Sequence, residues 1–236
     1  YIRKLNQISS SFYEKSAKDF SSSRSYSWQG WEKTWEFLQK SDFTPDTILD
    51  IGCGNGRFAA FLEQKIKNFN YLGVDNSKKL LTEAKKVYES PNIVFKELDL
   101  IKDAFPRKNI DFICCFGVLH HIPGITNRRR LLENIEKSLK AGGIAVITLW
   151  QFMKYERFRK KIVKWEEIGV NEKDLEKNDY LLDWRRGKKG LRYCHYTTKE
   201  EFDQIVKLTN LREIHTFFAD GKSNDMNRYV LLMRVR

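Results

Sequence analysis

The chain has 236 residues, of which 41% are hydrophobic and 31% are charged, as in an ordinary globular protein. No apolar run approaches the roughly 20 residues of a membrane-spanning helix, and the segment from Tyr1 to Gln7 lacks the apolar core of a signal peptide. Lys and Arg number 43 against 31 Asp and Glu, a formal charge of +12 that favours a polyanionic partner such as nucleic acid, although a lysine-rich composition bias would give the same excess.

The four cysteines, Cys53, Cys114, Cys115 and Cys194, include no Cys-x-x-Cys pair, and only four histidines could assist them. We therefore expect no metal site. Cys114 and Cys115 lie inside an apolar run, which predicts a buried strand. Free thiols of this kind indicate a reduced, cytoplasmic protein.

Residues 1–45 are expected to form a helical extension ahead of the sheet. Ser21–Ser23 is a short polar break within it. Beyond this break, an amphipathic helix packed on the core is predicted by the helical spacing of Trp28, Trp31, Trp35 and Leu38.

Residues 46–150 alternate between short apolar runs and helical patterns. One helix begins near Phe58, Ser77 can cap a second, and a third is expected to end at Gly142-Gly143. The expected strands are Thr47–Ile51, Phe69–Val74, Ile93–Phe95, Ile110–Phe116 and Ile144–Leu149. This alternation predicts an α/β domain, a parallel sheet with helices on both faces, which forms the cofactor-binding core.

Two further regions complete a single domain. Residues 151–196 are basic, aromatic and partly helical in pattern, and we expect them to form a substrate-binding insertion after the fifth strand. In residues 197–236, Thr198 and Glu201 form a capping-box pattern that opens a last helix. Leu211–Phe218 and Arg228–Val235 then predict two antiparallel strands, which brings the sheet to seven strands with an antiparallel last strand.

A glycine-rich sequence, Asp50-Ile-Gly-Cys-Gly-Asn-Gly56, follows the first expected strand and opens a helix. Glycines there allow a tight turn and a close approach of the backbone to a ligand. Asp75 ends the second strand, where a carboxylate can accept hydrogen bonds from both ribose hydroxyls, and Asp99 after the third strand can reach an adenine amino group. The Gly-x-Gly-x-x-Gly spacing of NAD sites fails, because Arg57 stands in place of the third glycine.

This combination resembles the class I methyltransferases, which have a Rossmann-like fold, use S-adenosylmethionine and release S-adenosylhomocysteine. The resemblance implies that the glycine loop holds the methionine part of the cofactor, with Asp75 at the ribose and Asp99 near the adenine. The implied cofactor-binding residues are Asp50, Gly52, Gly54, Gly56, Asp75, Asn76, Asp99, Leu100 and Phe116.

Several other segments carry a narrower similarity. They are Tyr13–Arg24 with Trp28, Gly117–Ile122 with Arg128–Arg130, Trp150, Asp179–Trp184 and Arg192–Tyr196. Together they resemble the tRNA wobble-uridine carboxymethyl methyltransferases, which esterify the carboxylate of 5-carboxymethyluridine; Asp183 stands where that family commonly has proline. The resemblance implies a tRNA substrate and, as in many members, a small zinc-binding activator subunit.

A carboxylate with a pKa of about 4 is ionised at neutral pH and needs no general base, so the site should orient it and exclude water. Arginine can grip a carboxylate through two parallel hydrogen bonds, and the candidates for catalysis by orientation are Arg24, Arg192 and His120. The other residues expected to bind substrate are Tyr13, His121, Trp150, Asp179, Trp184, Arg185, Tyr193 and His195. Among them, Trp184 and His195 also suit a packing role.

Basic and aromatic residues alternate across the insertion, among them Arg157, Phe158 and Lys161. This pattern suits phosphate binding and base stacking, and equally suits solvated charges beside packed rings. Two other functions stay open: a class I enzyme with a small-molecule substrate, and a non-catalytic RNA-binding subunit with this fold. The first predicts turnover without RNA, and the second predicts no binding of S-adenosylmethionine.

Overall fold

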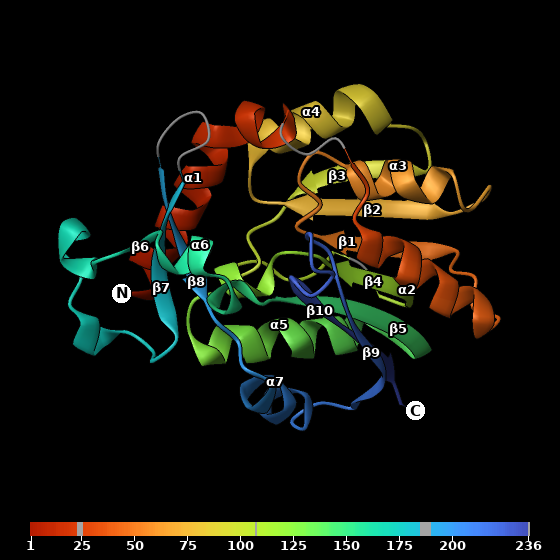
Figure 1. The fold of residues 1–236 in the computed structure, drawn as a ribbon. Helices are drawn as coiled ribbons and strands as arrows, with labels where there is room; N and C mark the ends of the chain where they lie inside the picture. Colours follow the sequence, from red (N-terminus) through yellow and green to blue (C-terminus); the bar gives the residue numbers. More distant parts are fainter. Residues whose placement is uncertain (23–25, 107, 185–189, 236) are drawn as a thin grey trace.

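The computed structural model describes residues 1–22, 26–106, 108–184 and 190–235. Its centre is a seven-stranded sheet in the order β3-β2-β1-β4-β5-β10-β9 (Figure 1). The strands are β1 (Thr47–Ile51), β2 (Asn70–Asp75), β3 (Ile93–Glu97), β4 (Ile110–Cys115), β5 (Leu139–Trp150), β9 (Leu211–Ala219) and β10 (Asn227–Arg234). β10 runs antiparallel to both of its neighbours, whereas β3, β2, β1, β4 and β5 pair in parallel. The predicted Rossmann-like sheet with an antiparallel last strand is therefore confirmed.

Helices cover both faces of this sheet, so its central strand β4 is buried on both sides. On one face lie α2 (Gln29–Lys40), α3 (Arg57–Glu63) and α4 (Lys78–Tyr88), packed on strand residues such as Ile48. On the other face lie α5 (Ile125–Ser138) and α7 (Lys199–Val206), packed on residues such as Leu49. The side chains of successive strand residues thus point into two separate hydrophobic cores, one on each face of the sheet.

The N-terminal helix α1 (Ile2–Ser22) crosses from the insertion to α4 along the edge where the parallel strands end (Figure 1). Leu5, near its start, packs with Trp165 and Leu181 of the insertion, and Ala17, near its end, packs on Leu80 of α4. The predicted helical extension is therefore a strap across this edge of the sheet, continued by α2.

The insertion contains a small antiparallel sheet of β6 (Ile162–Val163), β7 (Asp179–Trp184) and β8 (Gly190–His195). Short helices precede and interrupt it: the 3₁₀ turns Phe152–Lys154, Trp165–Ile168 and Glu172–Asp174, and α6 (Glu156–Arg159). The partly helical pattern of the sequence is therefore correct for these turns but incomplete, because the hairpin β7–β8 forms the centre of the insertion.

The expected end of the third core helix at Gly142-Gly143 is wrong. α5 ends at Ser138, and β5 begins at Leu139. Ile110 of β4 pairs with Leu139, while Phe112 pairs with Ile144, so residues 140–143 bulge out of the strand. Gly142 has a φ of +75° and serves this bulge.

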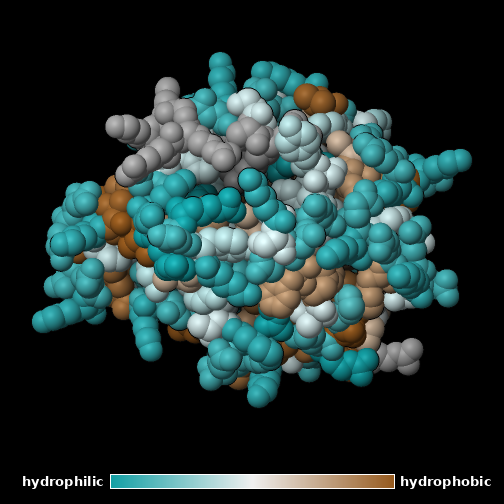
Figure 2. All heavy atoms as spheres, viewed as in Figure 1, coloured by the Kyte–Doolittle hydropathy of each residue, from teal (hydrophilic) through white to brown (hydrophobic). Residues whose placement is uncertain are grey.

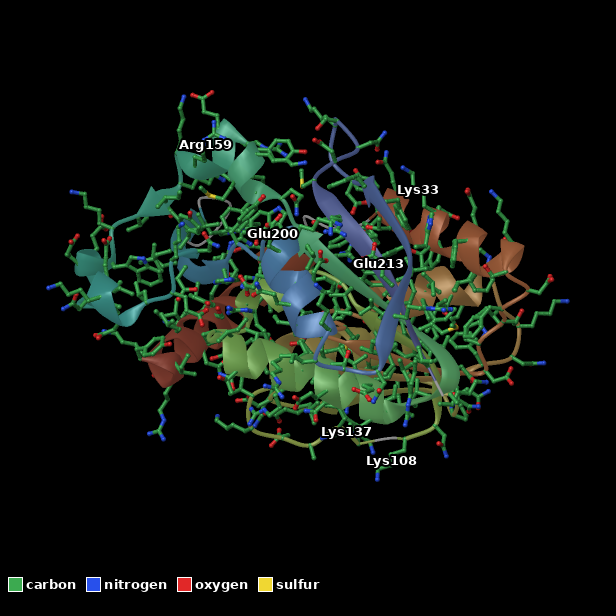
Figure 3. All side chains as sticks on the ribbon, turned by 90° about the horizontal axis from the view of Figure 1, so that it is seen from below. Lys33, Lys108, Lys137, Arg159, Glu200 and Glu213 are labelled. Atoms are coloured by element: carbon green, nitrogen blue, oxygen red, sulfur yellow. The ribbon has the colours of Figure 1, made fainter. Side chains whose placement is uncertain are left out.

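Hydrophilic residues dominate the face of the molecule drawn in Figure 2, and charged side chains project around the outline in Figure 3, including Lys33 from α2 and Arg159 from α6. None of the described helices is both long enough and apolar enough to cross a lipid bilayer.

Candidate active site

The glycine loop leaves β1 beside the end of β2. The Gly52 N–H donates to the Val74 carbonyl oxygen at 2.7 Å, and the Gly54 N–H donates to the Asp75 carboxylate at 2.9 Å. Gly52 has a φ of +72°, and a Cβ there would lie 2.2 Å from Val118 Cγ2. Gly54 has a φ of +56°, but a Cβ there would meet no atom within 4 Å, because it would point into open space. The loop is thus pressed against protein at Gly52 and faces a cavity at Gly54.

Two acids follow the loop. The Asp75 carboxylate accepts hydrogen bonds from the N–H groups of Gly54 and Ser77, both at 2.9 Å, and burial raises its pKa. Asp99 accepts from the Ile101 N–H at 2.9 Å and pairs with Lys102 at 2.9 Å. Burial of Asp99 opposes ionisation, but the hydrogen bonds from Lys102 and the Ile101 amide outweigh it and lower the pKa of this carboxyl.

Asp50 lies at the inner end of the same site. Its side chain is 2% exposed and accepts a 2.6 Å hydrogen bond from the Tyr71 hydroxyl. The pKa of Asp50 is raised to about 7, chiefly by burial; the Tyr71 hydrogen bond and the Arg57 charge lower it, and the nearby Asp75 charge adds to the rise. A cationic ligand in this cavity would favour the ionised form.

A first cavity lies between the loop, the two acids and α1. Of the residues expected to bind the cofactor, eight line it: Asp50, Gly52, Gly54, Asp75, Asn76, Asp99, Leu100 and Phe116. Gly56 lies behind the loop, where a Cβ would meet Tyr88 at 2.9 Å and Phe95 at 3.0 Å. This cavity fits a nucleoside with a cationic amino-acid tail, because it combines open space at Gly54 with the ionisable Asp50 and the two acids Asp75 and Asp99.

Sequence reasoning missed part of the wall that the N-terminal strap supplies. Asn6 and Ser9 of α1 line the first cavity beside Tyr13, which is one of the predicted substrate residues, and so does Trp28, which stacks on Trp31 with ring centroids 5.7 Å apart. Trp28 precedes α2, whose Gly30 N–H donates to Asp220 at 3.0 Å. The helical spacing of the tryptophans located α2 but did not indicate that its first ring faces a cavity.

A second cavity of about 310 Å³ adjoins the first, and Tyr13, Trp28 and Gly117 line both. The predicted substrate residues His120, Trp150, Trp184 and Arg192 lie in its wall. They come from the turn after β4, the end of β5 and the hairpin β7–β8, so the fold brings together residues that are far apart in the sequence. The shared residues mark the boundary between the two cavities.

Arg192 is the buried cation of the second cavity. Its side chain is 6% exposed, and its guanidinium carbon lies 4.8 Å from the Trp150 ring centroid and 5.3 Å from that of Trp184. Its Nε has no hydrogen-bond partner, and within the described parts of the chain no carboxylate forms an ion pair with it. A buried guanidinium without a counter-ion, stacked on aromatic rings, is suited to receive an anionic ligand.

The two histidines after β4 have different surroundings. His121 Nε2 lies 2.7 Å from the Tyr13 hydroxyl, and His121 Nδ1 lies 2.8 Å from the Tyr193 carbonyl oxygen, so this ring ties α1 to β8. The His120 ring packs on Trp150 with centroids 5.0 Å apart and lines the second cavity. His121 therefore holds Tyr13, which lies between the two cavities, and His120 faces the second cavity.

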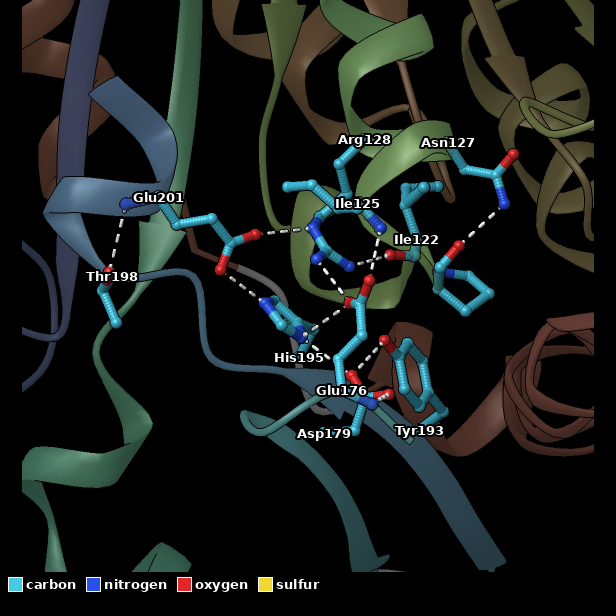
Figure 4. A network of polar contacts seen from close by, with 11 residues as sticks. Ile122, Ile125, Asn127, Arg128, Glu176, Asp179, Tyr193, His195, Thr198 and Glu201 are labelled. Carbon is cyan, nitrogen blue, oxygen red and sulfur yellow. Dashed lines mark hydrogen bonds and ion pairs between the residues drawn. The ribbon is translucent and has the colours of Figure 1, made fainter. Parts of the chain in front are cut away.

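Three residues expected to contact substrate, Asp179, Tyr193 and His195, line neither cavity. They belong to a buried polar network (Figure 4), in which Asp179 accepts from the Tyr193 hydroxyl at 2.7 Å and lies 2.8 Å from His195 Nδ1. Burial lowers the pKa of His195, but its contacts with Asp179 and with Glu201, at 2.8 Å, outweigh this effect and raise it.

Arg128 of α5 completes this network. Its side chain is 1% exposed and pairs with Glu176 at 2.6 Å and with Glu201 at 2.9 Å. The network joins α5 and α7 to the hairpin β7–β8, so it fixes the strand that carries Arg192 (Figure 4). Glu201 thus faces Arg128 and His195, while Thr198 caps α7 by accepting from the Glu201 N–H.

Two clusters have the composition of metal ligands: His120, His121 and Cys194, and Glu176, Asp179 and His195. In the first, both ring nitrogens of His121 already contact Tyr13 and Tyr193. In the second, Arg128 and hydrogen bonds within the network supply the partners. Of the other predicted residues, Arg24 and Arg185 lie outside the described residues.

Comparison with known proteins assigns the class. A family model described as a methyltransferase domain matches residues 23–216, and the chain belongs to this family. The geometry of the first cavity fits its cofactor, S-adenosylmethionine. A methyltransferase structure from Clostridium acetobutylicum has a TM-score of 0.68 at 15% identity and covers 96% of this chain and 97% of its own, which shows the shared fold.

Among curated relatives, the tRNA (carboxymethyluridine(34)-5-O)-methyltransferase of Schizosaccharomyces pombe is 30% identical over 61% of this chain and 58% of its own length. The protein of the same name from Arabidopsis thaliana is 27% identical over 58% of this chain and 31% of its own length. The chain thus spans less than two thirds of the length of either relative.

Proposed function

We propose that this methyltransferase transfers a methyl group to the carboxylate of 5-carboxymethyluridine at the wobble position of tRNA. The observation that carries the proposal is Arg192, a buried guanidinium without a described counter-ion, in a cavity that shares lining residues with the cofactor cavity. An acceptor carboxylate would supply the missing anion. The names of the relatives above support the same acceptor, and the charge of +12 suits a nucleic acid.

The residues of the chain orient the acceptor rather than deprotonate it. Bound S-adenosylmethionine supplies an electrophilic methyl group. A carboxylate is already ionised at neutral pH, so Arg192 only needs to hold it in line with that methyl group through two N–H donors. Trp150 and Trp184 exclude water from the pair and add no positive charge, which leaves the carboxylate nucleophilic. His120 contributes a polar edge beside the same ring of Trp150.

RNA would approach from the insertion, where Arg157 and Lys161 stand at the second cavity. Phosphate contacts by such residues make binding fall steeply with salt concentration. A small zinc-binding activator subunit belongs to this proposal as a partner, on the strength of the resemblance alone.

The test is transfer of a tritiated methyl group to tRNA that carries 5-carboxymethyluridine, with and without a candidate activator subunit. The proposal predicts label in the tRNA that is released by mild base, because the product is an ester. Turnover of a free carboxylic acid with no labelling of tRNA would instead favour the small-molecule alternative, and base-stable label would exclude ester formation.

A further inference from the structure

A row of two aromatic rings with a cation at each end crosses the second cavity. The Arg192 guanidinium carbon lies 4.8 Å from the Trp150 ring centroid, the Trp150 and Phe158 centroids are 4.9 Å apart, and the Arg157 guanidinium carbon lies 4.8 Å from the Phe158 centroid. All four residues line this cavity. We refer to Arg192, Trp150, Phe158 and Arg157 as the cation–aromatic row.

The two ends of the row differ in exposure. Arg192 is buried, whereas Arg157 is exposed, so one cation lies at the bottom of the cavity and the other near its opening. Arg157 forms no ion pair with an acidic residue in the described parts of the chain. Its neighbours on α6 are engaged elsewhere: Arg159 donates to the Met153 carbonyl oxygen at 2.8 Å, and Lys160 pairs with Glu156 at 2.8 Å. Neither of these neighbours lines the cavity.

This arrangement matches a ligand with two anionic groups separated by a flat ring. A single acceptor carboxylate would need only Arg192. A volume of about 310 Å³ is at the small end of ligand cavities and admits one such unit rather than a stretch of bases. Aromatic side chains stack on bases that have left the helical stack, and enzymes that modify a base commonly take the nucleotide out of its stack.

We propose that the second cavity is a subsite for one everted nucleotide, with the base carboxylate at Arg192, the ring beside Trp150 and Phe158, and a flanking phosphate of the same nucleotide at Arg157. This inference rests on the proposed function and adds the phosphate contact to it. Arg157 is then a specificity residue that distinguishes a nucleotide from a free carboxylic acid, whereas Arg159 of the same helix is not.

The test uses an anticodon stem-loop with 5-carboxymethyluridine at the wobble position and two analogues, each with a neutral methylphosphonate on one side of that nucleotide. Dissociation constants are measured by fluorescence anisotropy at one fixed salt concentration, with the protein saturated with S-adenosylhomocysteine. Wild-type protein and the Arg159→Ala variant should each bind one of the two analogues at least fivefold more weakly than they bind the native stem-loop. Arg157→Ala should bind the native stem-loop more weakly and lose nothing further with that analogue.

Equal losses in Arg157→Ala and wild-type protein, or indifference of wild-type protein to both analogues, would overturn the inference. So would a native stem-loop that fails to bind. Methyl transfer to the native stem-loop is measured separately. Binding with the expected phosphate dependence but without methylation would contradict the proposed function. Methylation without that phosphate dependence would contradict only this inference.

Discussion

Asp50 makes folding and cofactor binding depend on pH in a direction that the structure fixes. The residue is 2% exposed, and its pKa is raised from 3.8 to about 7, chiefly by burial. The unfolded chain loses this proton near pH 4, while the folded protein keeps it up to about pH 7. Between these values the folded state binds more protons, so this group lowers the free energy of unfolding as the pH rises.

The size of this effect follows from the same values. Each tenfold change in an acid dissociation constant corresponds to about 1.4 kcal/mol, so Asp50 costs the folded protein up to about 4 kcal/mol at and above pH 7. Asp50→Asn keeps an acceptor for the Tyr71 hydroxyl but has no proton to lose. The variant should therefore gain stability relative to wild-type protein as the pH rises from 4 to 7, with a constant difference above pH 7.

Urea unfolding of both proteins across this pH range gives the difference directly. A second readout is calorimetric: the cationic cofactor should release a proton from wild-type Asp50 near pH 7, which titration in two buffers of different ionisation enthalpy detects, and Asp50→Asn should release less. Parallel stability curves for the two proteins, together with equal proton release, would refute the assignment of a protonated Asp50.

Three further outcomes follow from the site. Gly54→Ala should lose about 1 kcal/mol of stability because of its positive φ, and at least tenfold in S-adenosylmethionine affinity because its Cβ would enter the first cavity. The control Gly169→Ala, with a φ of +62° and open space around its Cβ, should lose stability in unfolding experiments but keep cofactor affinity in calorimetry. Arg128→Met should cost up to about 3–5 kcal/mol in urea unfolding, since it leaves two partly buried carboxylates uncompensated. Arg129→Met should change little because its pair with Glu133 is exposed, and equal effects of the two variants would contradict the network. Arg192→Lys should keep cofactor affinity and lose most methyl transfer in a single-turnover assay, because a point charge lacks the two parallel donors; full activity would argue against bidentate orientation.

The cofactor half of the site could be predicted from the sequence because its signals are local. The glycine loop directly follows β1, Asp75 is the last residue of β2, and Asp99 comes shortly after β3. Parallel strands bring these ends to one edge of the sheet, so the spacing along the chain translates into proximity. Gly56 shows the limit of this reasoning, because the same motif contains a glycine required by packing against Tyr88 and Phe95.

The substrate half could be predicted only in part, because its contacts are between distant segments. The conspicuous polar residues of the hairpin include Asp179 and His195, and nothing near them in the sequence indicates that Arg128 and Glu201 bury and satisfy them. Conversely, Arg192 is among the residues predicted to orient the substrate, but the sequence does not distinguish its surroundings from those of the other basic residues. Its isolation from carboxylates and its aromatic surroundings are properties of the folded chain.

The central claim is that Arg192 presents a carboxylate to the cofactor, and one comparison tests it most directly. Single-turnover methyl transfer is measured on tRNA with wobble 5-carboxymethyluridine and on the same tRNA with the corresponding neutral amide, for wild-type protein and Arg192→Ala. The account predicts ester formation only on the carboxylate, a loss of at least a hundredfold in Arg192→Ala, and an unchanged dissociation constant for S-adenosylmethionine. Methylation of the amide, or an Arg192→Ala variant within twofold of wild-type protein, would contradict it.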